Sequence, residues 1–231
     1  MNSLLLFEDE KESDYYKVLD QERVDHVEKV LKSNVGDILK VTLVGSGIGT
    51  GLLQEISSNH LKIKTLDINP KAEGLFELLI GVSRPHSCQK ILEHGTCMGV
   101  SRFNFFSAKL SEKSYLNSKL FLDPLKYLKY GLSQSGLYHK MPEVFLSNTF
   151  SKGQKFILHP GSNKTFRDYP LIPKEKITLA IGPERGFTKD EVEHFKDLGF
   201  LEVSLGTPIL RVEIATFAAL GQLHLLLENG P

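Results

Sequence analysis

The sequence has few of the residues that build a disulfide framework or a metal site. Only two of its 231 residues are cysteines, Cys88 and Cys97, and they do not form a Cys-x-x-Cys pair. The eight histidines include no His-Glu-x-x-His pair, and Glu191 and His194, three residues apart, have no further ligand beside them. We therefore expect free thiols in a reducing compartment and no bound metal.

Net charge and long apolar runs are also missing. The 28 basic residues balance the 28 acidic ones, so a nucleic-acid partner, which neutrality neither requires nor excludes, would need basic groups gathered in patches. The apolar segment 4–7 has no basic segment before it, and no apolar run approaches the about 18 residues of a membrane span. With 41% apolar and 24% charged residues, the composition predicts an ordered, cytoplasmic protein of one large or two small domains, without a membrane partner.

The first 70 residues have a β-rich pattern. Residues 38–44 and 60–66 are typical of strands. Apolar and polar residues alternate in the second segment, so one of its faces is exposed to solvent. One helical segment, 24–31, places four apolar residues on one face: Val24, Val27, Val30 and Leu31. We expect these elements to close into a small antiparallel barrel, with a linker at 69–74.

Four glycines follow the strand predicted at 38–44. Gly45, Gly47, Gly49 and Gly51 superficially resemble a nucleotide-phosphate loop, which needs a helix directly after it. Residues 52–57 continue more naturally as a returning strand, so we predict a hairpin loop. A nicotinamide-dependent oxidoreductase that used these glycines would require a helix at 52–57.

After residue 70 the pattern changes to alternating strands and helices. Strands are predicted at 77–82 and 100–106, and helices at 88–94, with a stop at Gly95, and at 124–132. Thr188 and Glu191 form a capping box for a helix that ends before Gly199, and the last helix is predicted to begin near Glu213. This alternation predicts a parallel sheet flanked by helices.

Three apolar strands in the last third of the chain end in turns that contain glycine or proline. The strands are predicted at 155–158, 177–181 and 201–205. In open parallel sheets, ligands bind outside the carboxyl ends of the strands, so we place the ligand at these turns. The turns contain no nucleophile with an adjacent base, which disfavours hydrolysis, whereas their backbone groups suit the polar edge of a flat heterocycle. We predict a cofactor that carries its own reactivity.

Two motifs in these turns are more specific. Ile181-Gly182-Pro183-Glu184-x-Gly186-Phe187, followed by Leu205-Gly206-x-x-Ile209-Leu210-Arg211-x-Glu213-x-Ala215, resembles the RsmE family of 16S ribosomal RNA uridine-N3 methyltransferases, in the SPOUT superfamily. Weaker similarity covers nearly the whole chain, at His26-x-x-x-Val30-Leu31-Lys32, Val35-Gly36-Asp37 and Gln134-Ser135-Gly136 followed by Pro142.

The resemblance implies a fold and a reaction. The fold would be an α/β knotted SPOUT methyltransferase domain at 71–231, with a parallel sheet and a deep trefoil knot, preceded by a small PUA-like β-barrel RNA-binding domain at 1–70. The chain would form a homodimer with sites near the subunit interface. The implied reaction transfers a methyl group from S-adenosyl-L-methionine, leaving S-adenosyl-L-homocysteine, to N3 of a uridine in 16S rRNA, free or in the assembled small ribosomal subunit.

The matching positions imply roles for single residues. Uracil N3 is protonated at neutral pH, so catalysis must remove that proton or stabilise the anion. Arg211 is expected to stabilise this charge or to position a phosphate, and Glu213 is either a base or a structural partner of Arg211 or of the helix N-terminus. RNA contacts are expected from His26, Lys29, Lys32 and Arg185. The cofactor-binding residues would be Leu158, His159, Pro160, Ile181, Gly182, Pro183, Glu184, Gly186, Leu205, Gly206, Ile209 and Leu210.

Other hypotheses remain open. The chain could be a non-catalytic RNA-binding or ribosome-assembly protein that keeps the fold, or a methyltransferase that acts on another RNA. The acidic run at 8–12 and the altered residues around Gln134 favour loss of turnover, whereas Arg211 and Glu213 oppose it. The small residues of the last helix pack either in the core or at a dimer contact: Ala215, Ala218, Ala219 and Gly221.

Overall fold

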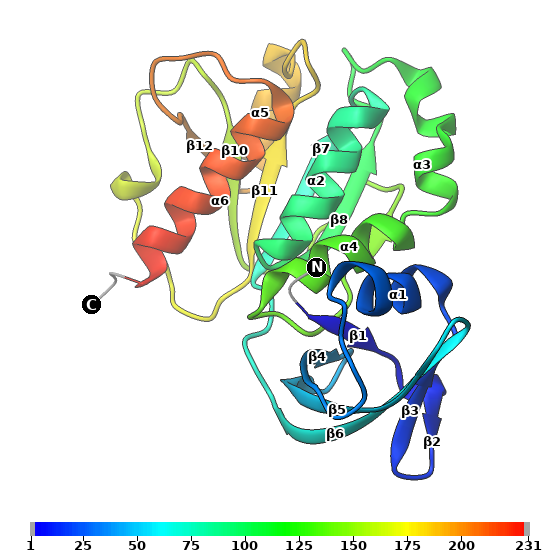
Figure 1. Cartoon of the computed structure of the whole chain (residues 1–231). Coiled ribbons are helices and arrows are strands. Elements are labelled where there is room, and N and C mark those ends of the chain that lie inside the picture. Colours follow the sequence, from blue (N-terminus) through cyan, green and yellow to red (C-terminus); the bar gives the residue numbers. More distant parts are fainter. Residues whose placement is uncertain (1–2, 229–231) are drawn as a thin grey trace. The chain divides into compact units, whose positions relative to one another are not determined.

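The computed structural model describes residues 3–228, and the chain divides into two compact units (Figure 1). The first unit holds the chain up to Glu73 together with Lys129–Met141. The second unit holds Gly74–Leu128 and the chain from Pro142 onward. Residues 129–141 therefore return to the unit in which the chain begins.

The first unit contains a six-stranded sheet in the order β1-β4-β5-β6-β3-β2. Its pairs are antiparallel except for β1 and β4, which run parallel. The strands are β1 (Leu4–Leu6), β2 (Lys11–Glu12), β3 (Tyr15–Val18), β4 (Ile38–Leu43), β5 (Gly47–Ser57) and β6 (His60–Asn69). A 3-10 turn, η1 (Glu8–Glu10), lies between β1 and β2.

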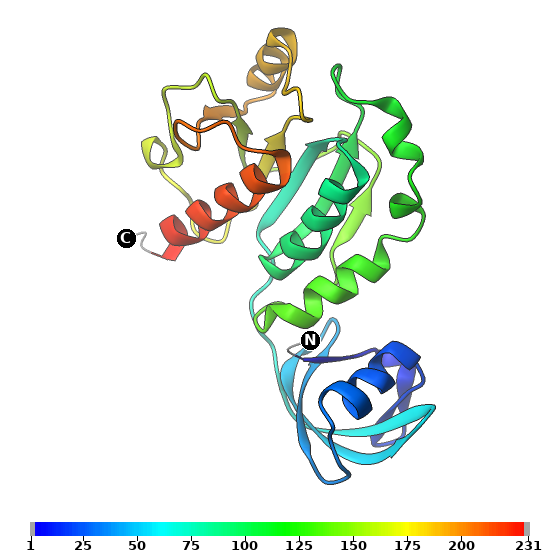
Figure 2. The same ribbon diagram turned by 45° about the horizontal axis from the view of Figure 1, so that its top comes forward.

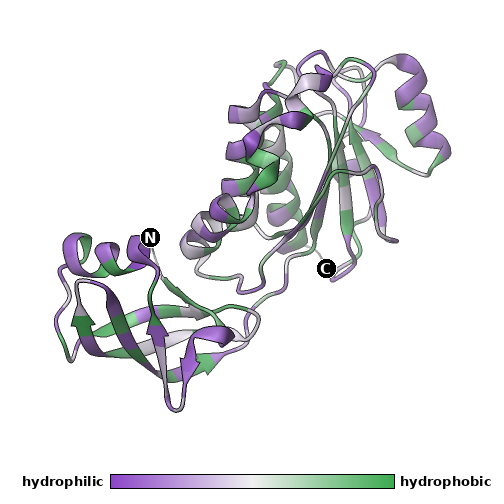
Figure 3. Ribbon diagram, turned by 90° about the vertical axis from the view of Figure 1, so that its right-hand side faces the viewer, coloured by the Kyte–Doolittle hydropathy of each residue, from purple (hydrophilic) through white to green (hydrophobic). Residues whose placement is uncertain are grey.

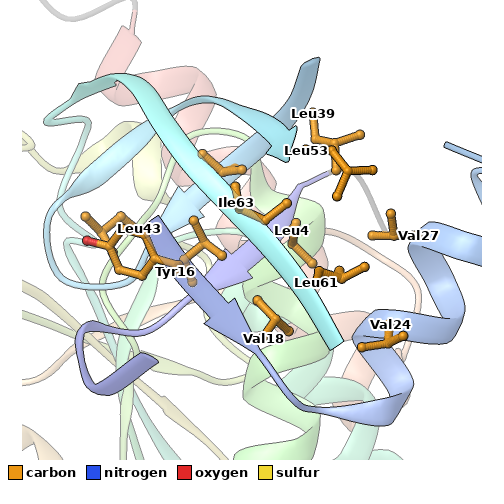
Figure 4. Packing of buried hydrophobic residues seen from close by; sticks show 12 residues of the cluster. Leu4, Tyr16, Val18, Val24, Val27, Leu39, Leu43, Leu53, Leu61 and Ile63 are labelled. Atoms are coloured by element: carbon orange, nitrogen blue, oxygen red, sulfur yellow. The ribbon is translucent and has the colours of Figure 1, made fainter. Parts of the chain in front are cut away.

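Apolar side chains from these strands meet in one core. Figure 4 shows Leu39, Leu53 and Ile63 packed in this cluster together with Val24 and Val27. The two valines come from α1 (Gln21–Asp25) and from the π-helix η2 (His26–Val30) that continues it. Alternate residues of the longer strands supply the core because successive side chains point to opposite faces.

The apolar face predicted for 24–31 is only half right. Val24 and Val27 are buried, whereas Val30 is 65% exposed and Leu31 48% exposed. The amide of Leu31 donates to the carbonyl oxygen of His26, five residues back. A π-turn holds more residues than an α-turn, so Val30 and Leu31 rotate off the face that Val24 and Val27 share.

The predicted hairpin is confirmed, but the loop is shorter than predicted, because Gly47, Gly49 and Gly51 belong to the strand β5. β4 and β5 pair antiparallel, Gly45 occupies the turn with φ +87°, and residues 52–57 belong to β5. A Cβ on Gly49 would lie 1.5 Å from the carbonyl oxygen of Asp67 on β6. These glycines therefore let strand backbones approach closely, and the helix that a nucleotide-phosphate loop needs is a strand instead.

The second unit is built on a parallel sheet, as predicted. Its strand order is β12-β10-β11-β7-β8-β9, and every neighbouring pair runs parallel. Figure 3 shows hydrophobic segments along these strands, which are typical of a sheet covered on both faces. The strands are β7 (Phe76–Gly81), β8 (Val100–Phe106), β9 (Glu143–Phe145), β10 (Gln154–Leu158), β11 (Ile177–Ile181) and β12 (Leu201–Val203).

Helices cover both faces of this sheet. Leu79 of β7 belongs to a core cluster with Phe195 of α5, whereas the ring of Phe76, three residues earlier on β7, lies 4.9 Å from the ring of His224 on α6. Residues an odd number apart in a strand face opposite ways, so α5 and α6 lie on opposite faces. Figures 1 and 2 show α2 beside α6. The helical elements after β7 are α2 (Pro85–Cys97), η3 (Lys113–Asn117), α3 (Lys119–Leu122), α4 (Leu125–Ser135), η4 (Phe166–Asp168), α5 (Lys189–Asp197) and α6 (Val212–Glu228).

Helix ends follow the sequence signals in one case and not in another. The Thr188 capping box is confirmed, since the Glu191 amide donates to Thr188 Oγ1 at 3.3 Å and the Thr188 amide donates to Glu191 Oε2 at 2.8 Å.

The stop predicted at Gly95 is wrong, because α2 continues to Cys97. A Cβ on Gly95 would lie 2.9 Å from the Phe103 ring, so this glycine admits an aromatic neighbour. Gly99, with φ +83°, is the glycine that follows the helix end.

No helix in residues 3–228 has the length and apolar character needed to cross a membrane. The same residues contain no group of three or more His, Cys, Asp or Glu side chains placed to hold a metal ion.

Candidate functional site

The three predicted turns meet at one edge of the parallel sheet. They follow β10, β11 and β12, whose carboxyl ends lie together because the strands run parallel. The turns line a cavity of ≈ 850 Å³. All twelve residues expected to bind the cofactor line it, together with Arg185, Arg211 and Glu213.

The first and third turns are joined by backbone hydrogen bonds. The amide of His159 donates to the carbonyl oxygen of Val203 at 2.9 Å, and the amide of Ser204 donates to that of Lys164 at 2.7 Å. The Ser162 hydroxyl also donates to the carbonyl oxygen of Glu202 at 3.2 Å. The segment after β10 therefore holds the segment that leaves β12.

The second turn depends on its glycines. The amide of Gly186 donates to the carbonyl oxygen of Pro183 at 2.7 Å, and Gly186 has φ +73°. A Cβ on Gly182 would lie 2.9 Å from the carbonyl carbon of Gly186, and a Cβ on Gly81 would lie 2.6 Å from Pro183 Cδ. Larger residues would push this turn away from the end of β7.

The third turn is more open. Gly206 has φ +114°, and its amide donates to Ser204 Oγ at 3.2 Å. Ile209 is 88% exposed, whereas Leu205 and Leu210 are half-buried. The turn thus offers backbone groups at Gly206 and apolar surface on both sides of it.

Glu184 makes a contact that the sequence did not predict. Its Oε1 accepts a hydrogen bond of 2.8 Å from the amide of Arg84, at the start of α2, and lies 4.0 Å from Arg84 Nε. The second turn is therefore tied to the amino end of α2, one hundred residues earlier in the chain.

The start of α2 adds a wall to the cavity that sequence reasoning missed. Arg84, His86, Ser87 and Lys90 all line the cavity. The helix was predicted to begin at residue 88, but it begins at Pro85, directly after the turn that follows β7. Proline is favoured in the first turn of a helix, so Arg84-Pro85 was the signal that could have located this wall.

Arg211 and Glu213 lie at the start of α6. Arg211 is exposed, and its carbonyl oxygen accepts a hydrogen bond of 2.8 Å from the Ala215 amide. Glu213 is only 6% exposed although it lines the cavity, and it lies in the first turn of α6. The positive end of the helix dipole stabilises a carboxylate there.

A buried thiol lies near these groups. Burial is the main cause that raises the pKa of Cys88 to about 12; a hydrogen bond to Ser83 opposes the shift, and the nearby carboxylates of Glu184 and Glu213 add to it. Cys88 Sγ donates to the carbonyl oxygen of Ser83 at 3.4 Å. The thiol stays protonated at neutral pH, so it is not a nucleophile for this site.

The remaining predicted RNA contacts belong to the first unit and do not line the cavity. His26 is half-buried, its Nε2 has no hydrogen-bond partner, and burial lowers its pKa. Lys29 forms an ion pair of 2.9 Å with Asp25, and Lys32 follows η2 with φ +54°. These three residues and Arg185 therefore belong to different units of the chain.

The lining suits a flat, polar-edged ligand. The cavity volume lies within the about 300–1,000 Å³ that is usual for small-molecule sites. Leu158, Ile181 and Leu205 supply apolar surface, and the backbone is uncovered by side chains at Gly182 and Gly206. These features fit an adenine-containing group, which pairs an apolar ring with a hydrogen-bonding edge.

Comparison with known proteins gives consistent matches. The model of the RNA methyltransferase domain family matches residues 72–224. The chain is 46% identical over 221 residues to the ribosomal RNA small subunit methyltransferase E of Synechocystis sp., covering 90% of this chain and 72% of that protein. It is 29% identical over 236 residues to the Treponema pallidum protein of the same name, covering 94% and 88%.

Solved structures share the fold. A ribosomal RNA small subunit methyltransferase E from Neisseria gonorrhoeae, bound to S-adenosyl methionine, superposes with a TM-score of 0.77 at 19% identity, covering 97% of this chain and 98% of that one. A methyltransferase from Legionella pneumophila, in complex with SAM, gives a TM-score of 0.79 at 23% identity with the same coverage.

Proposed function

We propose that this chain, which belongs to the ribosomal RNA small subunit methyltransferase E family, methylates N3 of a uridine in 16S rRNA with S-adenosyl-L-methionine as cofactor. One observation carries the proposal. The cavity lies wholly within the matched range 72–224, and both sequence motifs of the family line it. The substrate is 16S rRNA, free or in the assembled small subunit, and this substrate implies a cytoplasmic location.

The cofactor supplies a methyl group on a positively charged sulfur, which is already activated for transfer. Leu158, Ile181 and Leu205 would pack against its adenine ring. The backbone at Gly182 and Gly206 would meet the polar edge of the ring. The remaining cofactor-binding residues would be His159, Pro160, Pro183, Glu184, Gly186, Ile209 and Leu210.

Arg211 and Glu213 are our candidates for the chemistry at uracil N3. Within residues 3–228, no carboxylate forms an ion pair with Arg211, so its planar donors are available to the uracil anion. Glu213 lines the same cavity two residues further on and is the candidate acceptor of the N3 proton. Both residues are carried by the start of one helix, which fixes their backbone positions relative to each other.

We also propose the finer features of the fold that the family implies. The six-stranded sheet of the first unit, close to the expected domain 1–70, would be a PUA-like barrel that contacts RNA through His26, Lys29 and Lys32. The domain expected at 71–231 would carry the trefoil knot. The hydrogen bonds from the 159–164 segment to 202–204 support it, because the C-terminal chain runs against the loop that it would thread.

A homodimer is part of the same proposal, with α6 in the contact. Ile214 is 47% exposed on this helix, and a Cβ added to Gly221 would meet nothing within 4 Å. A helix that presents small and apolar residues to open space permits the close approach of a second helix. Sedimentation of the purified chain over a range of concentrations tests this point independently of the reaction.

The proposed reaction is tested by methyl transfer from labelled S-adenosyl-L-methionine to small ribosomal subunits from cells that lack this protein. We expect N3-methyluridine in the 16S rRNA, identified by mass spectrometry of the nucleosides. No transfer, with cofactor binding intact in calorimetry, would overturn the proposal. That result would favour the hypothesis of a binding-only protein or of another RNA substrate.

A further inference from the structure

The first turns of α2 present a row of basic and polar side chains to the cavity. Arg84, His86, Ser87 and Lys90 all line it. His86 and Lys90 are four residues apart, and Ser87 and Lys90 are three apart, so these side chains share one face of the helix. The Arg84 side chain is 76% exposed. This row was not among the residues that the family motifs pointed to.

The cavity concentrates positive charge in a chain whose formal net charge is zero. Four cations line it, against two carboxylates. One carboxylate, Glu184, accepts the Arg84 amide proton, and the other, Glu213, is 6% exposed. The four cations are Arg84, Lys90, Arg185 and Arg211.

Three of these cations have no acidic partner among residues 3–228. In the part of the chain that the structure describes, Lys90, Arg185 and Arg211 form no ion pair, and Arg84 reaches Glu184 only at 4.0 Å. Some lysines elsewhere are paired with a carboxylate, as are Lys62 with Glu55 and Lys109 with Asp190. Cations that are left unpaired at a cavity mouth favour an anionic ligand.

The cofactor alone does not account for this charge. S-adenosyl-L-methionine has a single carboxylate, an ammonium and a sulfonium, and it has no phosphate. One carboxylate can neutralise one of the four cations. A ligand with several negative groups would pair with the others, and an RNA strand offers one phosphate per nucleotide.

We propose that Arg84, His86 and Lys90, a set that we call the α2 strip, bind the phosphate backbone of the RNA strand that carries the target nucleotide. This inference rests on the proposed function, because it takes RNA as the substrate. The Ser87 hydroxyl lies in the same row and is a further donor to phosphate oxygens. The α2 strip holds the strand at the cavity mouth, while Arg211 acts on the base.

The test measures binding of a fluorescent 16S rRNA transcript between 50 and 200 mM salt. Arg84→Gln and Lys90→Gln remove charge but keep the Arg84 amide that Glu184 binds. We expect each variant to weaken binding about fivefold at the lowest salt and to reduce the slope of log K against log salt by about 0.7 to 1. Cofactor affinity, measured by calorimetry, should stay within about twofold of the parent, since the α2 strip binds phosphate.

Lys152→Gln is the matched control. Lys152 is exposed and precedes β10, so it lies at the amino edge of the same sheet, away from the carboxyl edge with the cavity. This variant should keep the parent's affinity and salt slope.

Two outcomes would overturn the proposal that the α2 strip binds RNA phosphates. Arg84→Gln and Lys90→Gln could match Lys152→Gln in RNA binding, or they could lose cofactor affinity with RNA binding unchanged, which would assign the cations to the cofactor carboxylate. If the proposed function itself is wrong, the experiments give a different result. The parent would then not methylate the subunit, while the two variants would still bind the transcript more weakly than the parent.

Discussion

Two pairs of glycines, Gly47 and Gly49 in the first unit and Gly186 and Gly206 in the second, serve different purposes. In the first unit, a Cβ on Gly47 would lie 2.4 Å from the carbonyl oxygen of Asn69, and one on Gly49 would lie 1.5 Å from that of Asp67. In the second unit, a Cβ on Gly186 would meet nothing within 4 Å, and one on Gly206 would meet only Pro208, at 4.0 Å.

The comparison separates two reasons for a glycine: close packing against neighbouring backbone, and a backbone conformation with positive φ. The first group is glycine because neighbouring backbone occupies the space of a side chain. Gly186 and Gly206 are glycine because their φ angles of +73° and +114° are ones that other residues rarely adopt. Substitution in the first group should therefore damage folding, whereas substitution in the second should damage the cavity. The experiments below test that distinction, from the largest expected effect to the smallest.

The largest effect is expected for Gly49→Val. The new side chain would overlap the backbone of β6, so we expect the free energy of unfolding of the first unit to fall by at least about 3 kcal/mol. Limited proteolysis with fragments identified by mass spectrometry should show early cleavage within residues 1–73. Gly45→Ala is the control, because its Cβ would meet nothing within 4 Å and only its φ of +87° is unfavourable, which costs about 1 kcal/mol. Equal proteolysis of the two variants would contradict the packing argument.

Gly206→Val should keep the fold and lose the cofactor. A β-branched residue does not adopt φ +114°, so the third turn would change shape, and we expect cofactor affinity to fall at least about 100-fold, or about 2.7 kcal/mol. Calorimetry with S-adenosyl-L-methionine measures this loss. Lys152→Gln, a change at the opposite edge of the sheet, should bind like the parent. Unchanged affinity in Gly206→Val would remove the third turn from the proposed cofactor site.

Arg211→Ala should separate turnover from binding within the second unit. Arg211 is exposed at the cavity and has no acidic partner among residues 3–228, so its removal should leave cofactor affinity within about threefold. We expect kcat for methyl transfer to fall about 100-fold, or about 2.7 kcal/mol of transition-state stabilisation. Arg211→Lys keeps the charge without the planar donors, so its kcat should lie between those of the parent and Arg211→Ala. Equal turnover of Arg211→Ala and the parent would exclude a catalytic role.

A smaller effect is expected at the contact that joins the second turn to α2. Glu184→Ala removes the acceptor of the Arg84 amide, which should cost about 1 kcal/mol and lower cofactor affinity about fivefold. Glu184→Gln can still accept through its amide oxygen and should recover most of that affinity. If both variants lose affinity equally, the charge of Glu184 matters more than its hydrogen bond.

The smallest effect concerns the two thiols, both of which belong to the second unit. Burial raises the pKa of Cys88 to about 12, while Cys97 is half-buried. The stability that burial of the protonated Cys88 provides is present below the thiol pKa of the unfolded chain, about 8.5, and is lost as pH rises toward 12. A thiol reagent at pH 8 should therefore modify Cys97 well before Cys88. Equal labelling rates, followed by mass spectrometry, would contradict the burial of Cys88.

Several elements were predictable because their signals are local. The capping box joins Thr188 to Glu191 within one helical turn, and the glycine hairpin joins β4 to β5, its neighbour in sequence. The predictions that were wrong depended on distant partners. Gly95 indicated a helix end, but it contacts Phe103 in the next strand, and η2 turns Val30 and Leu31 away from the core by a π-turn that no residue pattern indicated.

The sequence by itself determined which turns would meet at the cavity. Apolar strands followed by glycine and proline turns indicate the carboxyl edge of a parallel sheet, and the two family motifs indicate which turns form the cavity. Only the tertiary structure decided that the start of α2 completes the cavity, that Glu184 binds an amide one hundred residues away, and that 129–141 rejoin the first unit. The physical reason is range: a turn or a cap is fixed by residues a few positions apart, whereas these contacts depend on how whole elements pack.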